Sequence, residues 1–267
     1  MSRHLWEAVI TAQTGVVHSG ETLGTTTYLR RERVLTPDGQ VAEIPLISGN
    51  SVRGRLRELA AEAWWVDREE PSLPAAVVHA LFSGGSLARA TDEPLSGQRL
   101  HQVHALCPPL EIFGAAGGGR ILDGAVQVGK MIPVSQQTQH FLPVDYRSAA
   151  APDIWDVVNV DYFTRKRRSR DEQSSPLRFG VELFVPGTQF YWWARIEPSA
   201  STAAVSLFAD TIADWLASGT VGGRLRSGYG RVQGAWRVLP ASLPEAGAWR
   251  VAEPLTGDES AVLAWLN

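Results

Sequence analysis

Two segments with the periodicity of amphipathic helices divide this chain of 267 residues and limit the folds that it can adopt. In residues 50–63, apolar side chains recur at intervals of three and four positions, with arginine and glutamate between them. Residues 205–216 repeat this spacing. The residues that can cap the first helix are Ser48, Asn50 and Ser51. The chain therefore predicts two amphipathic helices, far apart in sequence.

Segments with strand character flank both helices. They are rich in β-branched, aromatic and aliphatic residues, and they cover residues 5–12, 121–131, 178–185, 189–196 and 230–239. Pro186 and Gly187, between two of these segments, predict a β-hairpin. The order strand, helix, strand, strand, helix, strand is typical of a ferredoxin-like βαββαβ domain in the α+β class. We expect residues 1–267 to form this single domain.

Three polar or glycine-rich and proline-rich stretches interrupt the pattern. Residues 21–43 predict a loop or an irregular hairpin, because Pro37-Asp38-Gly39 is a turn signal. Residues 66–120 contain scattered prolines and glycine runs, which predict an insertion with short elements. A second insertion, residues 131–178, is polar and contains the run Arg165-Lys166-Arg167-Arg168-Ser169-Arg170, whose charges cannot pack inside a core.

The formal net charge of −3 conceals an uneven distribution of charge. Residues 49–57, 165–170 and 222–231 contain eleven basic side chains and no acidic ones, whereas the rest of the chain has 14 basic and 28 acidic residues. The sequence thus predicts a basic track on an acidic body, and its near-neutral average does not exclude a nucleic-acid partner.

Each basic segment suits phosphate binding for a different reason. A helix N-terminus followed by arginines attracts anions, and its candidate residues are Ser48, Gly49, Asn50, Ser51, Arg53 and Arg57. A glycine-rich loop lets the backbone approach a ligand, and its candidates are Gly222, Gly223, Arg224, Arg226, Ser227, Tyr229 and Arg231, with Tyr229 able to stack on a base. The basic run adds Arg165, Lys166, Arg167, Arg168 and Arg170 beside two aromatic residues. Each segment also has a purely structural interpretation: an ordinary capped helix for the first, a flexible helix-to-strand connection for the second and a solvated loop tip for the third.

Other signals carry less weight. His101, His104 and Cys107 have a spacing that can supply three zinc ligands, but a fourth is not evident nearby. Because a fourth ligand is missing, we expect no metal. The glycines at 114–119 lack a P-loop pattern, and we expect no cofactor. The sequence lacks an apolar run long enough to span a bilayer, and its start lacks a secretory signal. A cytoplasmic protein without a membrane partner is expected, in keeping with a single cysteine.

Four motifs occur in a characteristic order along the chain. Residues 45–57, PLISGNSVRGRLR, resemble the "I-P-G-S-S-L-K-G-x-L-R" signature of the RAMP superfamily of CRISPR proteins. Residues 110–114 resemble "x-x-L-F-G", residues 185–190 resemble "V-P-x-G-T-x-F", and residues 222–232 resemble "G-G-x-x-S-x-G-Y-G-x-V". The motifs span most of the chain and occur in the family's order, which makes them far more specific together than singly.

The resemblance implies a backbone subunit that polymerises along the guide RNA of a type III or type IV effector complex. It implies an RRM-like palm, a finger insertion at residues 66–120 and a β-hairpin thumb at 131–178 that displaces guide bases at intervals. The partners implied are guide RNA, further copies packed head to tail, other effector subunits and complementary target nucleic acid. Guide phosphates would then contact residues 48–57 and 222–231 without reading sequence.

The same resemblance bears on catalysis. Relatives that cut RNA carry an aspartate between the first strand and first helix, where this chain has Thr25-Thr26-Thr27. Because threonine cannot supply a carboxylate, we expect a non-catalytic subunit closer to type IV. Two alternatives remain: an endoribonuclease of the superfamily, with His18 as its candidate catalytic residue, and a module that binds a small phosphate ligand or a nucleotide.

Overall fold

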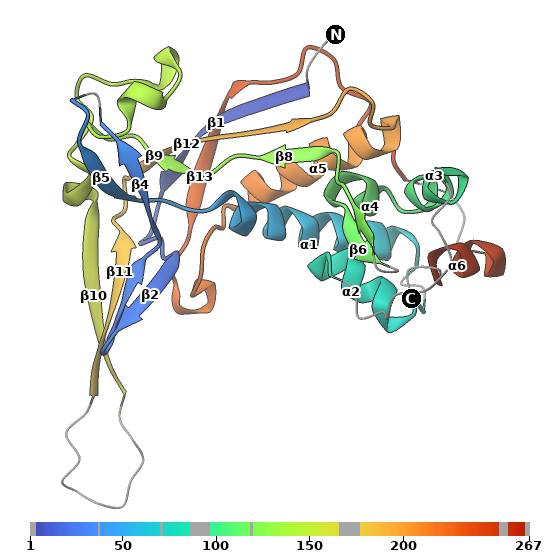
Figure 1. The fold of residues 1–267 in the computed structure, drawn as a ribbon, viewed down its shortest axis with the longest axis horizontal. Coiled ribbons are helices and arrows are strands. Elements are labelled where there is room, and N and C mark those ends of the chain that lie inside the picture. The colour runs from blue at the N-terminus through green and yellow to red at the C-terminus, as the bar shows by residue number, and fades with distance from the viewer. Residues whose placement is uncertain are drawn as a thin grey trace, which may run out of the picture.

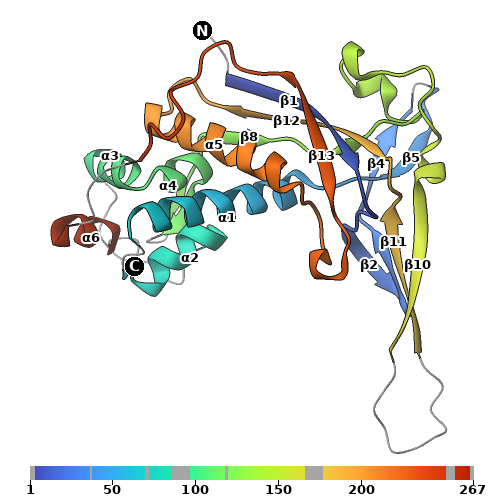
Figure 2. The same ribbon diagram turned by 180° about the vertical axis from the view of Figure 1, so that it is seen from behind.

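The computed structural model describes residues 4–36, 38–69, 72–85, 97–117, 120–165, 177–250 and 256–264. A central sheet carries two long helices on one of its faces, as Figures 1 and 2 show. Short helices gather at one end of this layer, and the sheets formed by residues 19–45 and 158–184 extend from the other end (Figure 1).

The central sheet is built from segments that are distant in sequence. Its strands are β1 (His4–Ala12), β8 (Val126–Val128), β9 (Ile132–Pro133), β12 (Gln189–Ile196) and β13 (Val232–Val238). The order is β13-β1-β12-β8, all pairs are antiparallel, and β9 also pairs with β12. The first strand of the chain therefore lies in the interior of the sheet, where alternate residues of β1 are buried.

The two long helices cover one face of this sheet. Helix α1 (Gly49–Asp67) follows β1 in the chain, and α5 (Thr202–Ser218) lies between β12 and β13. Trp6 of β1 meets Phe208 of α5 edge to face, with ring centroids 5.3 Å apart. The predicted amphipathic helices and the α+β class are confirmed.

A second sheet stands beside the first. It contains β2 (Ser19–Leu23), β3 (Thr26–Leu29), β10 (Val158–Arg165) and β11 (Leu177–Phe184) in the order β10-β11-β3-β2. Strands β10 and β11 form a long antiparallel hairpin, and β11 pairs with β3 in parallel. Strands β4 (Arg31–Leu35) and β5 (Val41–Pro45) form another hairpin nearby, so the stretch predicted as a loop or irregular hairpin forms two hairpins.

The predicted hairpin between residues 178–185 and 189–196 is wrong. Strand β11 pairs with β10 and β3, whereas β12 pairs with β1 along its whole length. At Pro186-Gly187 the chain passes from one sheet to the other, and Gly187 has a φ of 91°. Ala12 holds this crossing: its amide donates to Thr188 O (2.9 Å) and its carbonyl accepts from Gly187 N (2.8 Å). The turn chemistry was recognised correctly, but strand partners are chosen by tertiary packing.

Short elements occupy the remaining described parts. They are α2 (Ala75–Ser83), α3 (Gly97–Leu106), α4 (Pro108–Phe113), β6 (Ala115–Gly117), β7 (Arg120–Leu122), α6 (Gly257–Ala264) and the 3-10 turns η1 (Gln139–Phe141), η2 (Val144–Tyr146), η3 (Ile154–Val157) and η4 (Leu225–Ser227). The strand predicted at 121–131 is shorter than expected, because β7 takes its first residues and β8 begins at Val126. Within the described ranges, no helix combines the length and apolar character needed to cross a membrane.

Candidate nucleic-acid interface

The start of α1 is fixed by several contacts. Ser48 is the N-cap, and its hydroxyl oxygen accepts from Ser51 N at 3.3 Å. The amide of Ser48 donates to His18 Nε2 at 3.2 Å. Gly49 packs so closely on β8 that an added Cβ would lie 2.6 Å from Val128 O. Asn50 is exposed beside them. The helix start is thus held in place while one of its polar side chains faces solvent.

Arg57 lies on the buried side of α1 and is only 7% exposed. Its guanidinium donates to the carbonyl oxygens of Ala80 (2.9 Å), Phe113 and Gly114 (2.8 Å), at the ends of α2 and α4. Burial and the nearby charge of Arg53 lower the pKa of Arg57 to about 10, so this side chain remains charged at neutral pH. The guanidinium N–H groups of Arg57, which the sequence predicts to bind a guide phosphate, donate to the protein's own backbone.

Arg53, one turn earlier on α1, uses only part of its guanidinium in hydrogen bonds with the protein. Its Nη2 donates to Phe113 O at 2.7 Å, and burial lowers its pKa. Arg53 and Arg57 line an open pocket of about 700 Å³, to which Asp123 and Glu197 also contribute. Arg53 is half-buried and is therefore more accessible to solvent than Arg57.

The glycine-rich loop before β13 has a defined conformation. Gly222 has a φ of 75°, and an added Cβ would lie 2.3 Å from Val17 O. Gly223 N donates to the same carbonyl at 2.8 Å. Arg224 adopts a left-handed φ of 59°, which is costly for a residue with a side chain. Its strain is typical of residues at functional sites.

Two contacts fix this loop to the β10–β11 hairpin. The guanidinium of Arg224 lies 4.8 Å from the ring centroid of Phe163, and Tyr229 donates a hydrogen bond to Asp161. That bond raises the pKa of the Tyr229 hydroxyl. In Figures 1 and 2 the loop before β13 lies next to the second sheet. Tyr229, which was expected to stack on a base, is half-buried and engaged with the hairpin.

Other side chains of the loop face solvent. Arg226 and Arg231 are exposed, as is Ser227. Among the described residues, no carboxylate lies within ion-pair distance of either arginine. Exposed, unpaired guanidiniums on a fixed backbone are suited to bidentate contacts with phosphate.

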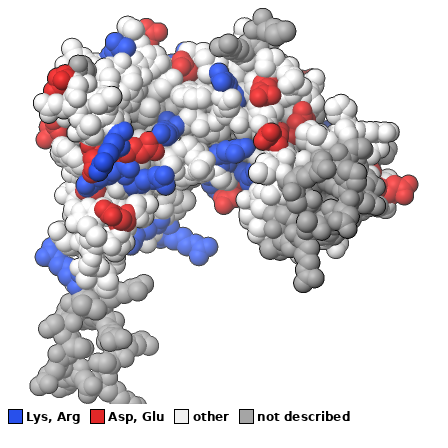
Figure 3. Space-filling view, in the orientation of Figure 1, with Lys and Arg blue, Asp and Glu red and all other residues white. Residues whose placement is uncertain are grey.

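The predicted basic run lies almost wholly outside the described residues. Arg165 is the last residue of β10 and pairs with Leu177, while Lys166, Arg167, Arg168 and Arg170 belong to the undescribed segment 166–176. Figure 3 shows lysine and arginine side chains gathered over the lobe that contains β2–β5, β10 and β11, with acidic side chains among them.

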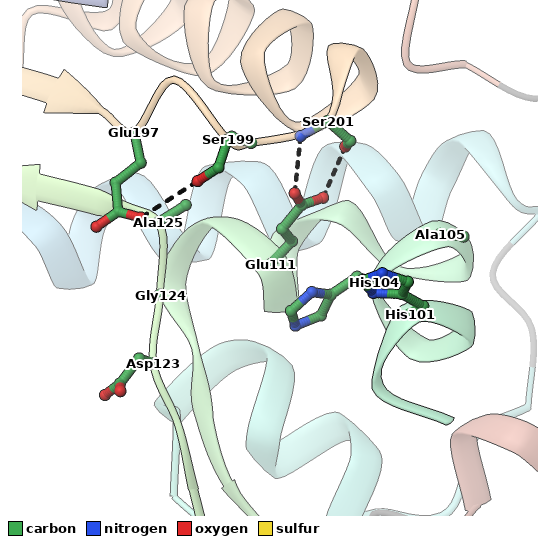
Figure 4. Close-up of a pocket in the computed structure, with 11 residues that line it drawn as sticks. His101, His104, Ala105, Glu111, Asp123, Gly124, Ala125, Glu197, Ser199 and Ser201 are labelled. Carbon is green, nitrogen blue, oxygen red and sulfur yellow. Dashed lines mark hydrogen bonds between the residues drawn. The ribbon is translucent and has the colours of Figure 1, made fainter. Parts of the chain in front are cut away.

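The candidate zinc ligands do not share one site, because Cys107 lies in the core and the two histidines line a pocket. Cys107 is fully buried in the core, and burial raises the pKa of its thiol to about 12. His101 and His104 line a separate pocket of about 560 Å³ with Glu111, whose carboxylate accepts from Ser201 N (2.8 Å) and Ser201 Oγ (2.6 Å) (Figure 4). Over the described ranges, no three histidine, cysteine or acidic residues cluster as a metal site would require.

Residues considered for catalysis have structural contacts. Thr25 lies in the turn between β2 and β3, and its carbonyl oxygen accepts from Gly180 N at 2.9 Å. Thr26 and Thr27 are the first residues of β3 and pair with β11. His18 uses Nε2 as an acceptor for the backbone of Ser48, and burial lowers its pKa. This imidazole nitrogen is therefore occupied by the start of α1.

Two arginines outside the predicted phosphate-binding segments lie over aromatic rings. Arg178 of β11 stacks on Tyr162 in the second sheet, and Arg31 of β4, in the neighbouring hairpin, stacks on Trp155. The sequence signals only part of this arrangement, because side chains alternate along a strand and Tyr162 and Phe163 must therefore lie on opposite faces.

No protein-family model matches this chain, and no curated protein matches it. Among solved structures, it is similar to a chain described as "Type IV-B CRISPR Complex". The two are 28% identical, the similarity covers 92% of this chain and 97% of that chain, and the TM-score is 0.68. This similarity confirms the resemblance to CRISPR effector-complex proteins that the four motifs predicted.

Proposed function

We propose that this protein is a non-catalytic backbone subunit of a CRISPR effector complex of type IV character. It binds guide RNA through phosphates, assembles along the RNA as head-to-tail copies with other effector subunits, and presents the guide to complementary target nucleic acid. The observation that carries the proposal is the pair of exposed guanidiniums, Arg226 and Arg231, on a glycine-rich loop fixed to the β10–β11 hairpin.

The connectivity of the central sheet supports an RRM-like palm. Its elements follow one another as β1, α1, β8, β12, α5 and β13, which is the βαββαβ order of ferredoxin-like domains. Residues 66–120 are then the finger insertion, and residues 131–178 the thumb insertion. The hairpin of that thumb uses β10 and β11, with β11 extending past residue 178 to Phe184.

The proposed phosphate contacts carry no sequence information. They come from the solvent-facing residues around the start of α1, from Arg53, from the exposed part of the 222–231 loop and from the basic run at 165–170. Contacts to phosphate fix position along RNA, and base contacts would be needed to select a sequence. A subunit of this kind accepts any guide, and Arg57 contributes to it only by holding the fold.

RNA binding by the purified full-length protein tests the proposal. We expect similar affinities for unrelated RNAs of equal length, and an affinity that falls steeply with salt as counterions are released. Fluorescence anisotropy at several salt concentrations measures both. Preparations from cells should carry nucleic acid, seen as a high ratio of absorbance at 260 to 280 nm. A clean protein spectrum with no RNA affinity would instead favour a small-ligand module.

The absence of catalysis is a separate expectation. Protein assembled on guide RNA and given complementary RNA should leave that RNA intact over hours, with or without divalent metal, because threonines stand at positions 25–27. Gel analysis of labelled RNA measures this. Discrete products that disappear in His18→Ala would establish the endoribonuclease alternative, provided that the variant keeps its thermal midpoint.

A further inference from the structure

Tyr162 and Arg178 form an exposed stacked pair near the described end of the β10–β11 hairpin. The guanidinium carbon of Arg178 lies 3.8 Å from the centroid of the Tyr162 ring, and 51% of Tyr162 remains exposed. Among the described residues, no carboxylate lies within ion-pair distance of Arg178. One side of the ring is thus occupied by a cation while half of its surface remains available.

A similar pair lies near the other end of the hairpin. Arg31 stacks on Trp155 at 4.9 Å and on Tyr28 at 5.5 Å, and Trp155 is 46% exposed. Glu182 neutralises Arg31 through an ion pair of 2.7 Å and also accepts from the amide of Leu29. The buried carboxylate fixes the arginine beneath an indole that faces solvent.

Both pairs lie over one face of the second sheet. Tyr162 and Arg178 belong to its strands, whereas Arg31 of β4 reaches that face through its ion pair with Glu182 and carries Trp155 of η3 with it. A Cβ on Gly180 would lie 2.9 Å from Thr26 Oγ1 and 3.1 Å from Val160 Cγ1, so these three positions share a face. Because side chains alternate along a strand, Tyr162 and Glu182 lie on that same face. Phe163 lies on the opposite face, where Arg224 covers it.

We propose that this aromatic–arginine face, made by Tyr162, Arg178, Trp155 and Arg31, binds unpaired bases of single-stranded RNA by stacking. Aromatic rings with half of their surface exposed give each base a platform, and the adjacent guanidinium of Arg178 is free to contact the backbone. A stack of this kind accepts every base, since each has a flat face. The inference rests on the proposed function, because it adds a base-binding surface on the side of the hairpin opposite the glycine-rich loop.

The test compares two oligoribonucleotides of equal length and charge, one with bases and one abasic, binding to the full-length protein. Tyr162→Ala and Trp155→Ala should each weaken binding of the base-containing RNA by roughly fivefold or more, the effect of losing one stacked base. Both variants should bind the abasic RNA as the unmodified protein does. Tyr162→Phe keeps the ring and should restore binding, and thermal unfolding checks that each variant is folded.

The outcomes separate this inference from the proposed function. Equal loss of both oligonucleotides in the aromatic variants, or no loss of either, would overturn the stacking surface and leave phosphate binding standing. Unchanged RNA affinity with impaired association between copies would assign the face to a protein partner and would also overturn it. If the unmodified protein binds neither oligonucleotide, the proposed function fails, and the inference fails with it.

Discussion

Replacing Arg57 with methionine is expected to lower the free energy of unfolding by roughly 3 kcal/mol or more. The substitution keeps most of the buried volume but leaves the carbonyl of Gly114 without its donor. It also removes a charged donor from the carbonyls of Ala80 and Phe113, which keep bonds from Gly84 N and Arg53 Nη2. A hydrogen bond to a charged group contributes about 1.5 to 3 kcal/mol, and solvent reaching the site would reduce the total loss. Urea denaturation followed by circular dichroism measures the change.

Arg55→Met on the same helix is the matched control. Arg55 forms an ion pair with Glu58 on the helix surface, at 3.1 Å, and such pairs contribute about 0 to 1 kcal/mol. We expect its removal to have little effect on unfolding. Arg57→Lys keeps the positive charge but not the forked geometry, so its stability should fall between the two. If Arg57→Lys instead kept full stability and lost RNA affinity, Arg57 would be a phosphate ligand after all.

The double variant Arg226→Glu, Arg231→Glu is expected to weaken RNA binding by on the order of a hundredfold at low salt. Both side chains are exposed, so their substitution removes two proposed phosphate contacts and adds two repulsive charges with little effect on folding. The slope of log affinity against log salt should fall by about 0.7 for each contact removed. Anisotropy titrations over a range of salt concentrations give both quantities.

A variant with the same change in net charge at other places controls for long-range electrostatics. This control is the double variant Arg195→Glu, Arg250→Glu. Arg195 lies on β12 and contacts Gln127, and Arg250 forms an ion pair with Asp67. We expect this variant to lose far less affinity and to keep the salt slope. Equal losses in the two double variants would mean that total charge, and not the glycine-rich loop, governs binding. A loss that depended on RNA sequence would also contradict phosphate recognition.

The sequence predicted those parts of the fold that depend on local chemistry. The periodicity of α1 and α5 located both helices, and Ser48, one of three candidate caps, is the residue that caps the first. The strands predicted at 5–12, 189–196 and 230–239 lie in the central sheet, because each carries its own pattern of alternation, whereas the strand predicted at 178–185 joins the second sheet. Gly222 and the other glycines marked the loop, since their spacing signals a turn whatever surrounds it.

Partners far away in sequence could not be predicted in this way. Arg57 fits the spacing of a surface arginine next to an anion site, and only the distant ends of α2 and α4 turn it into a buried donor. From the sequence, Tyr229 is likewise an available ring, but in the fold its hydroxyl donates a hydrogen bond to Asp161. Strands β11 and β12 are separated by an ideal turn but belong to different sheets. In each case a contact across the fold overrides the local signal.

The interior position of β1 has a consequence for how the protein is made. The ribosome synthesises this strand first, but its two neighbours, β12 and β13, end at Ile196 and Val238. Until β12 has been synthesised, the nascent chain therefore carries an alternating apolar strand with neither edge paired, a state prone to aggregation. Fragments that stop before β13 leave one edge of β1 open. Chaperone protection of the nascent chain would be needed longest at β1, which is synthesised well before both of its partner strands.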